Sequence, residues 1–393
     1  SKAKITAVAD DVTVSYGSPV SELTYSVSGQ IKQGDDLKIK ATTTATAESN
    51  VGSYPITFEW QENVNYDVTF VDAVYYVKAG TSGLNVTASG YTNKYDGNGH
   101  GITVTVKDSN GNNINDAVVY YSETPLDSTN YGSGSTSSPK YTDVGERTVY
   151  YYVHTVNYEG VAGSKTVNIT KKPVKVIAND NSITYGQEPS ENGVRFDGFV
   201  GTDSAASLGL APTYTYTYIQ YQKTGTYKIT PGGLSEDGNY TYQYVSGYLR
   251  VNAKNLTFEW SDNAYVYDGT EKVMTASPVG LESNDSVTLE YEGNTATAVG
   301  GYTAKVTGLA GDNADNYTIA SDERSAVQTW SISKGTNYLA TPLTMDNWTY
   351  GDTPSEPAGK AAYGTTRYVY SDFKNGEYTA SQPVDAGTYF VKI

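Results

Sequence analysis

Three alternating tyrosines are the residues of this chain whose type and spacing best suit ligand binding. Tyr214, Tyr216 and Tyr218 alternate with threonines, and side chains two apart on a β-strand lie on the same face of the sheet. Buried rings would pack in the core or in cross-strand pairs, and each tyrosine hydroxyl would then need a hydrogen-bond partner. Exposed rings could instead stack on sugar rings. The first role is the preferred interpretation, and the second makes these three tyrosines the candidate ligand-binding residues.

The chain has few residues that suit acid-base or nucleophilic catalysis. The chain contains two histidines and no cysteine. His100 lies in a glycine-rich turn and His154 in a tyrosine-rich strand, and neither belongs to a nucleophile motif. We therefore predict that the chain is not an enzyme and has no catalytic residue and no cofactor.

Two oxygen-rich loops raise the question of calcium. Residues 108–112 resemble the first ligands of a calcium loop, but the glycine at loop position six and the terminal glutamate are missing. A type I′ hairpin turn at Asn110-Gly111 is the preferred interpretation. Residues 311–316 gather more oxygens directly before a recurring Asn-Tyr pair. No metal site is predicted, while calcium between domains and a Lys–Asn isopeptide bond stay open.

The elements that position these residues come in repeats. A glycine enters an aromatic-rich strand and is followed, one strand later, by an Asn-Tyr pair. The glycines are Gly52, Gly145, Gly225, Gly300 and Gly387, and the pairs begin at Asn65, Asn157, Asn239 and Asn316. The fifth glycine has no such pair after it. Self-similarity at roughly 75–95 residues predicts small tandem domains rather than one large core.

Within each repeat the pattern is that of antiparallel strands. Apolar and polar residues alternate with a period of two in 102–106 and 165–169, and no long stretch keeps a helical period. The repeat length is close to that of an immunoglobulin-like sandwich. The predicted fold class is all-β, with tandem immunoglobulin-like β-sandwich domains in an elongated array.

The last strand of each copy predicts the domain boundaries. The five domains are 1–79, 80–171, 172–253, 254–334 and a truncated 335–393. A Tyr-Gly turn followed by proline marks the first, third and fifth, and a Tyr-Asp-Gly turn marks the second and fourth. Because the linkers are only a few residues long, neighbouring domains should touch, and each should enclose an interior of its own. We expect a monomeric, semi-rigid rod of about 150–200 Å within a longer chain.

The glycine phrase also predicts a tyrosine corner, in which a tyrosine hydroxyl bonds to backbone upstream at the entry to a late strand. The tyrosine stands two residues after the glycine. Arg147 replaces it in the second copy, so that corner must be satisfied differently. Aliphatic residues occupy the place of the second cysteine of antibody domains, namely Ile56, Val149, Ile229, Ala304 and Val391.

Two tryptophans share the phrase Thr-Phe-Glu-Trp at different places in their repeats. Trp60 follows a glycine strand and Trp260 opens a repeat. We interpret both, with Trp330 and Trp348, as packing residues rather than ligand anchors.

These turns and corners together resemble the MBG and YDG repeat domains of bacterial cell-surface proteins. The resemblance lies in the Tyr-Gly-x-Pro and Tyr-Asp-Gly openings and in the Ala-Gly-Thr-Tyr and Asn-Tyr closings, and it covers nearly the whole chain. It implies tandem immunoglobulin-like sandwiches in large proteins usually described as adhesins and sometimes joined to glycan-handling enzymes. It also implies an extracellular location, on the bacterial cell surface or secreted.

Charge narrows the class of partner. Lys+Arg 27 against Asp+Glu 43 gives a net charge of −16, so the surface repels nucleic acid and anionic lipid headgroups. No apolar run reaches the length of a membrane span. We therefore predict no nucleic-acid partner and no direct membrane insertion.

The predicted function is that of a non-catalytic extracellular repeat segment, an adhesin stalk and/or an adhesive module for host or microbial glycans, glycoproteins and proteins. The alternative is a carbohydrate-binding accessory region of an extracellular glycan-degrading system. Measurable affinity of one isolated domain for a polysaccharide would distinguish the alternative. A third hypothesis is protein capture by strand addition at an exposed sheet edge.

Overall fold

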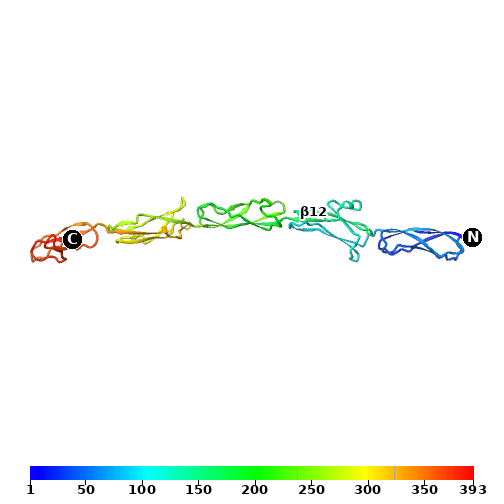
Figure 1. The fold of residues 1–393 in the computed structure, drawn as a ribbon, viewed down its shortest axis with the longest axis horizontal. Coiled ribbons are helices and arrows are strands. Elements are labelled where there is room, and N and C mark those ends of the chain that lie inside the picture. Colours follow the sequence, from blue (N-terminus) through cyan, green and yellow to red (C-terminus); the bar gives the residue numbers. More distant parts are fainter. Residues whose placement is uncertain (237, 323) are drawn as a thin grey trace. The chain divides into compact units, whose positions relative to one another are not determined.

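The computed structural model of this chain describes residues 1–236, 238–322 and 324–393. Its regular structure is almost entirely β-strand, with three short 3-10 turns and no α-helix among the described residues (Figure 1). Within these residues, no helix is long and apolar enough to cross a membrane. The predicted all-β class is confirmed.

The chain falls into two compact units. The first comprises Ser1–Ile177, Arg195–Thr213 and Gly232–Val245, and the second comprises Ala178–Val194, Tyr214–Pro231 and Ser246–Ile393. The third repeat contributes strands to both units.

The first repeat is a sandwich of a three-stranded and a four-stranded sheet. Its strands are β1 (Ala3–Ala9), β2 (Val12–Ser15), β3 (Tyr25–Gly29), β4 (Ile39–Thr43), β5 (Gly52–Trp60), β6 (Tyr66–Val71) and β7 (Ala73–Lys78). The sheet orders are β3-β1-β6 and β2-β7-β5-β4. β1 runs parallel to β6 and β2 parallel to β7, so the opening stretch of the repeat serves both sheets. Ile5 and Ala7 of one sheet pack with Ile39 of the other.

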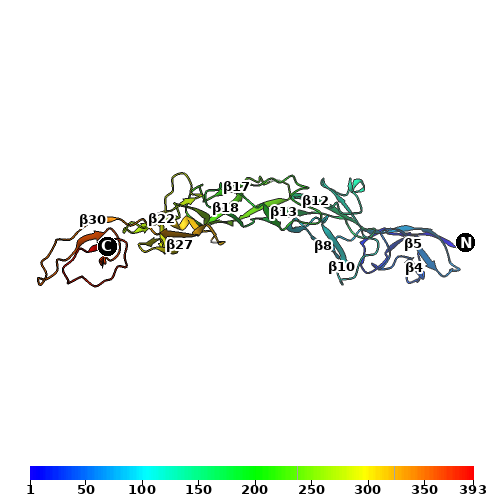
Figure 2. The same cartoon turned by 60° about the vertical axis from the view of Figure 1, so that its left-hand side comes forward.

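The second repeat also lies in the first unit. Its elements are β8 (Leu84–Ser89), β9 (Tyr91–Lys94), β10 (Thr103–Asp108), β11 (Val118–Ser122), η1 (Tyr131–Ser133), β12 (Gly145–His154) and β13 (Val161–Thr170). The sheet orders are β10-β8 and β11-β12-β13-β9, and Figure 2 labels β8, β10, β12 and β13. β9 runs parallel to β13, as β2 does to β7.

The third repeat forms one sheet in each unit. Its strands are β14 (Lys172–Ala178), β15 (Asn181–Thr184), β16 (Val194–Asp197), β17 (Thr213–Tyr216), β18 (Gly225–Gly232), β19 (Tyr240–Val245) and β20 (Gly247–Asn252). The first unit holds the sheet β16-β14-β19, and the second holds β15-β20-β18-β17. The pairings β14 with β19 and β15 with β20 are again parallel.

The fourth and fifth repeats belong to the second unit. The fourth contains β21 (Lys254–Trp260), β22 (Ala264–Val266), β23 (Lys272–Val273), β24 (Ala276–Val279), β25 (Thr288–Glu292), β26 (Thr295–Ala296), β27 (Gly300–Ala310), η2 (Ala314–Asn316), β28 (Tyr317–Ile319), η3 (Arg324–Ala326) and β29 (Val327–Ser333). Its sheets are β24-β21-β28, β22-β29-β27-β25 and β23-β26. The fifth contains β30 (Leu339–Thr344), β31 (Ala358–Ala361), β32 (Val369–Ser371) and β33 (Phe390–Lys392). The fifth repeat forms only the pairs β30-β31 and β32-β33, whereas the same sheet orders recur in the first, third and fourth repeats and confirm tandem immunoglobulin-like β-sandwich domains.

Aliphatic residues fill the position of the antibody cysteine, as predicted. Four of the five side chains are fully buried, with 0% exposure for Ile56, Val149, Ile229 and Ala304. Burying a valine or isoleucine side chain contributes about 1.5–3 kcal/mol. Apolar packing therefore holds the sheets together where antibody domains use a disulfide.

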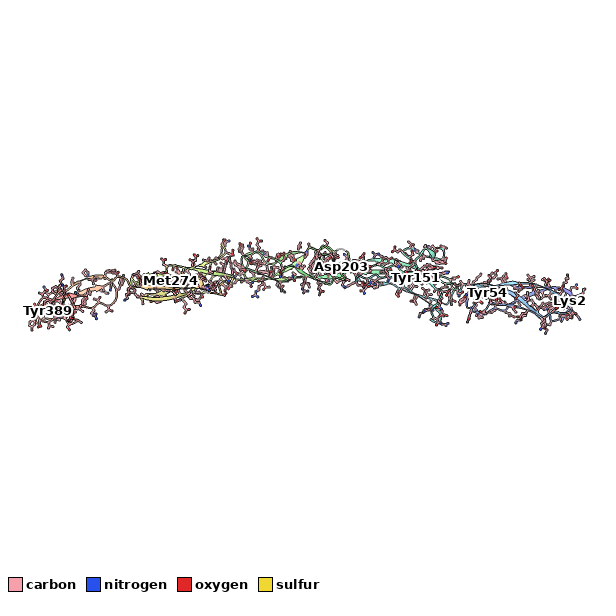
Figure 3. All side chains as sticks on the ribbon, in the orientation of Figure 1. Lys2, Tyr54, Tyr151, Asp203, Met274 and Tyr389 are labelled. Carbon is pink, nitrogen blue, oxygen red and sulfur yellow. The ribbon has the colours of Figure 1, made fainter. Side chains whose placement is uncertain are left out.

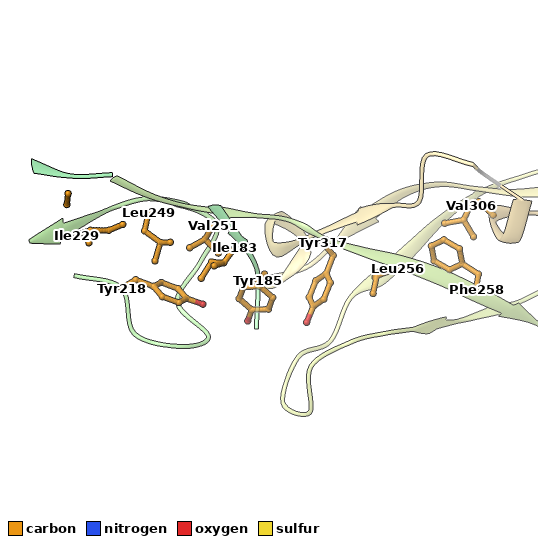
Figure 4. Close-up of a cluster of buried hydrophobic side chains, with 12 residues drawn as sticks. Ile183, Tyr185, Tyr218, Ile229, Leu249, Val251, Leu256, Phe258, Val306 and Tyr317 are labelled. Atoms are coloured by element: carbon orange, nitrogen blue, oxygen red, sulfur yellow. The ribbon is translucent and has the colours of Figure 1, made fainter. Parts of the chain in front are cut away.

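Buried clusters continue through the joints between repeats. In the second unit, one cluster contains Leu249 of the third repeat and Leu256 of the fourth (Figure 4). In the first unit, another contains Val167 of the second repeat and Tyr240 of the third. The expectation of a separate interior for each domain is wrong at these two joints, because the domains touch through apolar end residues.

The turn at Asn110-Gly111 differs from the prediction in type. Gly111 has a φ of +84°, whereas Asn110 does not have a positive φ, and type I′ requires one at both positions. The Gly111 N–H donates to the Asp108 carbonyl at 3.1 Å. The Asp108 carboxylate also accepts the N–H groups of Asn110 and Asn112, both at 2.8 Å. These bonds favour a type I turn followed by a left-handed glycine.

Candidate functional site: the joints between repeats

Each glycine strand begins with a clamped turn. The tyrosine two residues after the glycine donates its hydroxyl to the carbonyl oxygen four residues before it. These bonds join Tyr54 to Asn50 (2.8 Å), Tyr227 to Lys223 (2.6 Å), Tyr302 to Ala298 (2.7 Å) and Tyr389 to Asp385 (3.0 Å). Figure 3 labels the first and last of these tyrosines, Tyr54 and Tyr389. In the second repeat, Arg147 Nη1 donates to the carbonyl of Asp143 at 3.2 Å. The predicted tyrosine corner is confirmed, and arginine satisfies the copy that lacks the tyrosine.

The clamped turn presents one backbone N–H to the next repeat. This N–H belongs to the residue directly before the glycine, and it donates to Oδ1 of the asparagine in the following Asn-Tyr pair. The three bonds join Val51 to Asn157 (3.1 Å), Val144 to Asn239 (2.8 Å) and Thr224 to Asn316 (3.0 Å). The asparagine donates in return to Asn50 in the first joint and to Asp143 in the second, both at 3.0 Å. The repeated glycine and the repeated Asn-Tyr pair are therefore two halves of one contact.

Two tyrosine rings form the apolar part of each joint. One ring comes from the Tyr-Gly or Tyr-Asp-Gly turn of the leading repeat, and the other from the Asn-Tyr pair of the following repeat. Their centroids lie 5.3–5.4 Å apart, edge to face, in Tyr16–Tyr158, Tyr95–Tyr240 and Tyr185–Tyr317. Figure 4 shows Tyr185 and Tyr317 side by side. Such pairs add about 0.5–1.5 kcal/mol beyond the area that they bury.

Strand pairing places the leading tyrosine at the joint. The N–H of Tyr95 donates to the Thr170 carbonyl, and the N–H of Tyr185 to the Asn252 carbonyl, both at 2.8 Å. Each tyrosine thus directly follows a strand that runs parallel to the last strand of its repeat. Because that last strand leads into the next repeat, the turn tyrosine faces it.

In the first unit, an aspartate links the two tyrosines of the joint between the second and third repeats. The Tyr240 hydroxyl donates to Asp203 Oδ2 at 2.5 Å, and the Tyr95 hydroxyl donates to the same oxygen at 3.4 Å. The Tyr240 hydroxyl also accepts the N–H of Val200 at 3.1 Å. The carboxylate therefore holds a tyrosine from each repeat.

In the second unit, Asp285 has the same role between the third and fourth repeats. Its Oδ2 accepts the hydroxyls of Tyr317 at 2.6 Å and Tyr185 at 2.8 Å, and the Tyr317 hydroxyl accepts the N–H of Glu282 at 2.9 Å. The exposed fractions of Tyr185 and Tyr317 are only 3% and 5%. Burial first, and the hydrogen bond to the Asp285 carboxylate second, raise the pKa of both tyrosines.

The remaining joints have fewer bonds. The first joint has the ring pair and the Asn157 bonds, and among the described residues no carboxylate accepts the hydroxyl of Tyr16 or Tyr158. Between the fourth and fifth repeats, the rings of Tyr267 and Tyr363 meet at 5.4 Å. Tyr363 follows β31 in a loop rather than standing in an Asn-Tyr pair.

The candidate ligand-binding tyrosines turn their common face toward a buried cluster. Tyr218 is 2% exposed, and Tyr214 and Tyr216 are half-buried against the same cluster. The Tyr216 hydroxyl donates to Glu191 at 3.1 Å, and burial, with this carboxylate, raises the pKa of Tyr216 to about 12. Their ligand-binding role stays a prediction, and the burial of Tyr218 restricts it to Tyr214 and Tyr216.

The two histidines support aromatic packing. His100 stacks on Tyr91 with centroids 3.7 Å apart, and its Nε2 lies 2.8 Å from Asp96 Oδ1. That contact first, and the N–H of Asn98 second, lower the pKa of Asp96 to about 2. His154 stacks on Tyr131 at 4.9 Å.

The oxygen-rich loops use their oxygens for hydrogen bonds. Asp108 caps its own turn, and in the 311–316 loop Asn316 Oδ1 and the Asp315 carbonyl both accept bonds from Thr224, each at 3.0 Å. Across the described ranges, no group of three or more histidine and carboxylate side chains is placed to hold a metal ion.

Sequence reasoning assigned the Tyr-Gly, Tyr-Asp-Gly and Asn-Tyr residues to turns within a repeat and missed their role between repeats. One signal pointed there. The Asn-Tyr pair recurs although the strands around it vary, and a turn alone would accept glycine or aspartate in place of asparagine. Recurrence of one asparagine–aromatic pair beside each boundary is therefore a signature of a contact.

High pH is expected to weaken the joint centred on Asp285. The folded pKa of Tyr185 and Tyr317 lies above the value of 10.0 expected for a free tyrosine. Between these values the unfolded state has released protons that the folded state keeps, so the free energy of unfolding falls as pH rises above 10. Absorbance of tyrosinate at 295 nm should show a late-ionising fraction, and Asp285→Asn should shift that fraction to lower pH. An unchanged titration would contradict the assignment.

The two Thr-Phe-Glu-Trp phrases give a matched pair of variants. Trp260 Nε1 donates to the Ser325 carbonyl at 2.8 Å, whereas Trp60 Nε1 is buried without a partner among the described residues. Trp260→Phe should therefore cost about 1 kcal/mol more than Trp60→Phe, because only the first leaves a partly buried carbonyl without its donor. Hydrogen exchange of β21 and β5 in the two variants measures the difference, and equal losses would contradict it.

Comparisons with known proteins agree with this architecture in two segments. A family model described as "MBG domain (YGX type)" matches residues 5–76 and 174–250, which lie in the first and third repeats. Among curated proteins, none matches the chain. Assignment of the other three repeats to the related repeat types stays a prediction.

Some solved structures can be aligned with the chain at low similarity. Protocadherin Gamma B2 extracellular cadherin domains 3–6 align at 11% identity and a TM-score of 0.26, covering 84% of this chain and 98% of that one. Drosophila N-cadherin EC1-4 aligns at 9% and 0.22, covering 84% and 100%. A Bacteroides ovatus glucan-utilization protein, SGBP-B, in complex with a mixed-linkage heptasaccharide aligns at 13% and 0.16, covering 80% and 92%.

TM-scores this low support no inference about this chain. Its similarity to known proteins therefore rests on the family match and on the repeated contacts. The matched segments contain the Tyr-Gly turn, the clamped glycine turn and the Asn-Tyr pair that build the joints. Residues 5–76 and 174–250 are thus similar to MBG domains of the YGX type.

Proposed function

We propose that this chain is a non-catalytic, extracellular repeat segment of a bacterial surface protein, acting as an adhesin stalk and/or as an adhesive module for glycans and proteins. The observation that carries the proposal is the reuse of one joint. Three successive joints contain the same ring pair and the same asparagine bond. Such contacts hold neighbouring repeats together and provide no reacting group.

The stalk and the adhesive module differ in a binding measurement. The whole chain, immobilised through one end, is tested on arrays of glycans and of host proteins. A stalk gives no saturable retention, and an adhesive module gives retention of a defined class. Release of sugar from a bound polysaccharide would contradict the non-catalytic proposal.

Tyr214 and Tyr216 are the proposed contact residues if glycans are retained. Both side chains are only half-buried, and changing both to serine should then abolish retention while the fold survives. Tyr248→Ser is the matched control, because Tyr248 is 54% exposed on β20, which is separated from β17 by β18 in the same sheet. Loss of retention in the control alone would assign the site to β20. Glycan retention that survives the double change would exclude Tyr214 and Tyr216.

A further inference from the structure

The first repeat carries one half of a joint at the end that holds the Asn-Tyr pair. The Tyr66 hydroxyl donates to Asp35 Oδ2 at 2.7 Å and accepts the N–H of Lys32 at 3.1 Å. In the filled joint of the second unit, Tyr317 makes the same two bonds, with Asp285 and with a loop N–H. The part of a joint that a following repeat contributes is therefore already formed in the first repeat.

Tyr66 is 3% exposed, about as buried as Tyr240 and Tyr317 in the filled joints, whereas the two polar residues beside it are more exposed than their counterparts. Asp35 and Asn65 are exposed. In the filled joints, by contrast, Asp203 and Asp285 are partly covered, and Asn316 is 3% exposed. The Asp35 carboxylate and the Asn65 amide are thus accessible to solvent in the first repeat. In the filled joints, the corresponding groups accept a tyrosine hydroxyl and a backbone N–H from the leading repeat.

We propose that Asp35, which the buried Tyr66 holds in place, and Asn65 form a receiving surface for another repeat of this chain's own kind, held in tandem. The occupant must supply a Tyr-Gly or Tyr-Asp-Gly turn whose tyrosine hydroxyl reaches the carboxylate of Asp35. It must also supply a clamped glycine turn whose N–H reaches Asn65. The inference goes beyond the proposed function, because it identifies a docking partner by its chemistry and does not depend on glycan binding.

The bonds that the occupant must form are known from the joint between the second and third repeats. There a Tyr-Asp-Gly repeat leads a Tyr-Gly repeat, and Tyr95 and Val144 of the leading repeat contact Asp203 and Asn239 of the following one. The first repeat has the Tyr-Gly turn, like the third. A copy of the second repeat is therefore the matched occupant.

The test is a fusion of one additional copy of residues 80–171 directly before Ser1 of the whole chain. Hydrogen exchange, followed by mass spectrometry, compares peptides covering 30–38 and 63–68 with those of the unfused chain. We expect exchange at these peptides to slow at least about tenfold, as amides become part of a buried contact. The peptide with Val144 in the added copy should be protected to the same degree as its counterpart in the original second repeat.

Variants separate docking from mere proximity. Asn65→Ala or Asp35→Ala in the fused chain should return exchange at these peptides to the unfused rate. Tyr95→Ser confined to the added copy should do the same while leaving the receiving repeat intact. Unchanged exchange in the fusion would overturn the proposal.

A second copy is the competing occupant, because the fifth repeat carries a leading half at its far end. There Tyr350 is 69% exposed, and the corner bond from Tyr389 to Asp385 is formed. Concentration-dependent protection of 30–38 and 63–68 in the unfused chain would assign the surface to contacts between copies. That result would overturn the proposal of an occupant held in tandem.

Discussion

Asp285→Ala is expected to open the joint between the third and fourth repeats. The substitution removes the acceptor of two buried hydroxyls, those of Tyr185 and Tyr317. Both hydroxyls lose their acceptor, and Tyr317 keeps only the bond that it accepts from the Glu282 N–H. Leaving buried donors unsatisfied costs about 1–3 kcal/mol each, so we expect the joint to lose about 2 kcal/mol.

The loss should appear locally in hydrogen exchange. The Thr224 N–H, which donates to Asn316 across this joint, reports its opening. A loss of about 2 kcal/mol corresponds to exchange roughly 30-fold faster. Exchange of β4 and β5 in the first repeat should not change.

Asp35→Ala is the matched control for this prediction. Asp35 holds the same position in its repeat and accepts one tyrosine hydroxyl, that of Tyr66, without a second tyrosine from a leading repeat. Its removal should therefore affect the first repeat less than Asp285→Ala affects its joint. Equal effects would show that the aspartate serves the loop of its own repeat rather than the contact between repeats.

The features that sequence reasoning predicted are those set by short-range pattern. Alternation specified the strands, and the spacing from Gly52 to Tyr54 and Ile56 specified both the corner bond and the buried aliphatic residue. Each depends on residues within one turn and one strand. Such patterns can be recognised in the sequence because backbone geometry alone relates the positions of these residues.

The joints could not be derived in the same way. Asn239 and Val144 are 95 residues apart, and nothing in strand periodicity specifies which turn of one repeat meets which pair of the next. The same limit applies to Tyr218. Alternation predicted that three tyrosines share a face, but which face is buried depends on the cluster that packs against it.

Leu256→Ala is expected to have the largest effect on stability, and to affect two repeats. Leu256 is 0% exposed in β21 and belongs to the cluster that also contains Leu249 and Ile229 of the third repeat. Truncating a buried leucine costs about 2–5 kcal/mol through lost burial and a cavity. Because the cluster is shared, exchange should accelerate in β18 and β20 as well as in β21.

Met274→Ala separates a shared interior from a general loss of stability in the fourth repeat. Met274 is also 0% exposed, but its cluster contains Ala304, Trp330 and Ile332, all of the fourth repeat. Its truncation should cost a similar amount and accelerate exchange in β27 and β29 while leaving β18 and β20 unchanged. If both variants affected only the fourth repeat, the continuous cluster would be a contact without energetic coupling. If only Leu256→Ala accelerated hydrogen exchange in the third repeat, the stability of one repeat would depend on the next through the joint. Nearest-neighbour coupling in tandem repeats has this property.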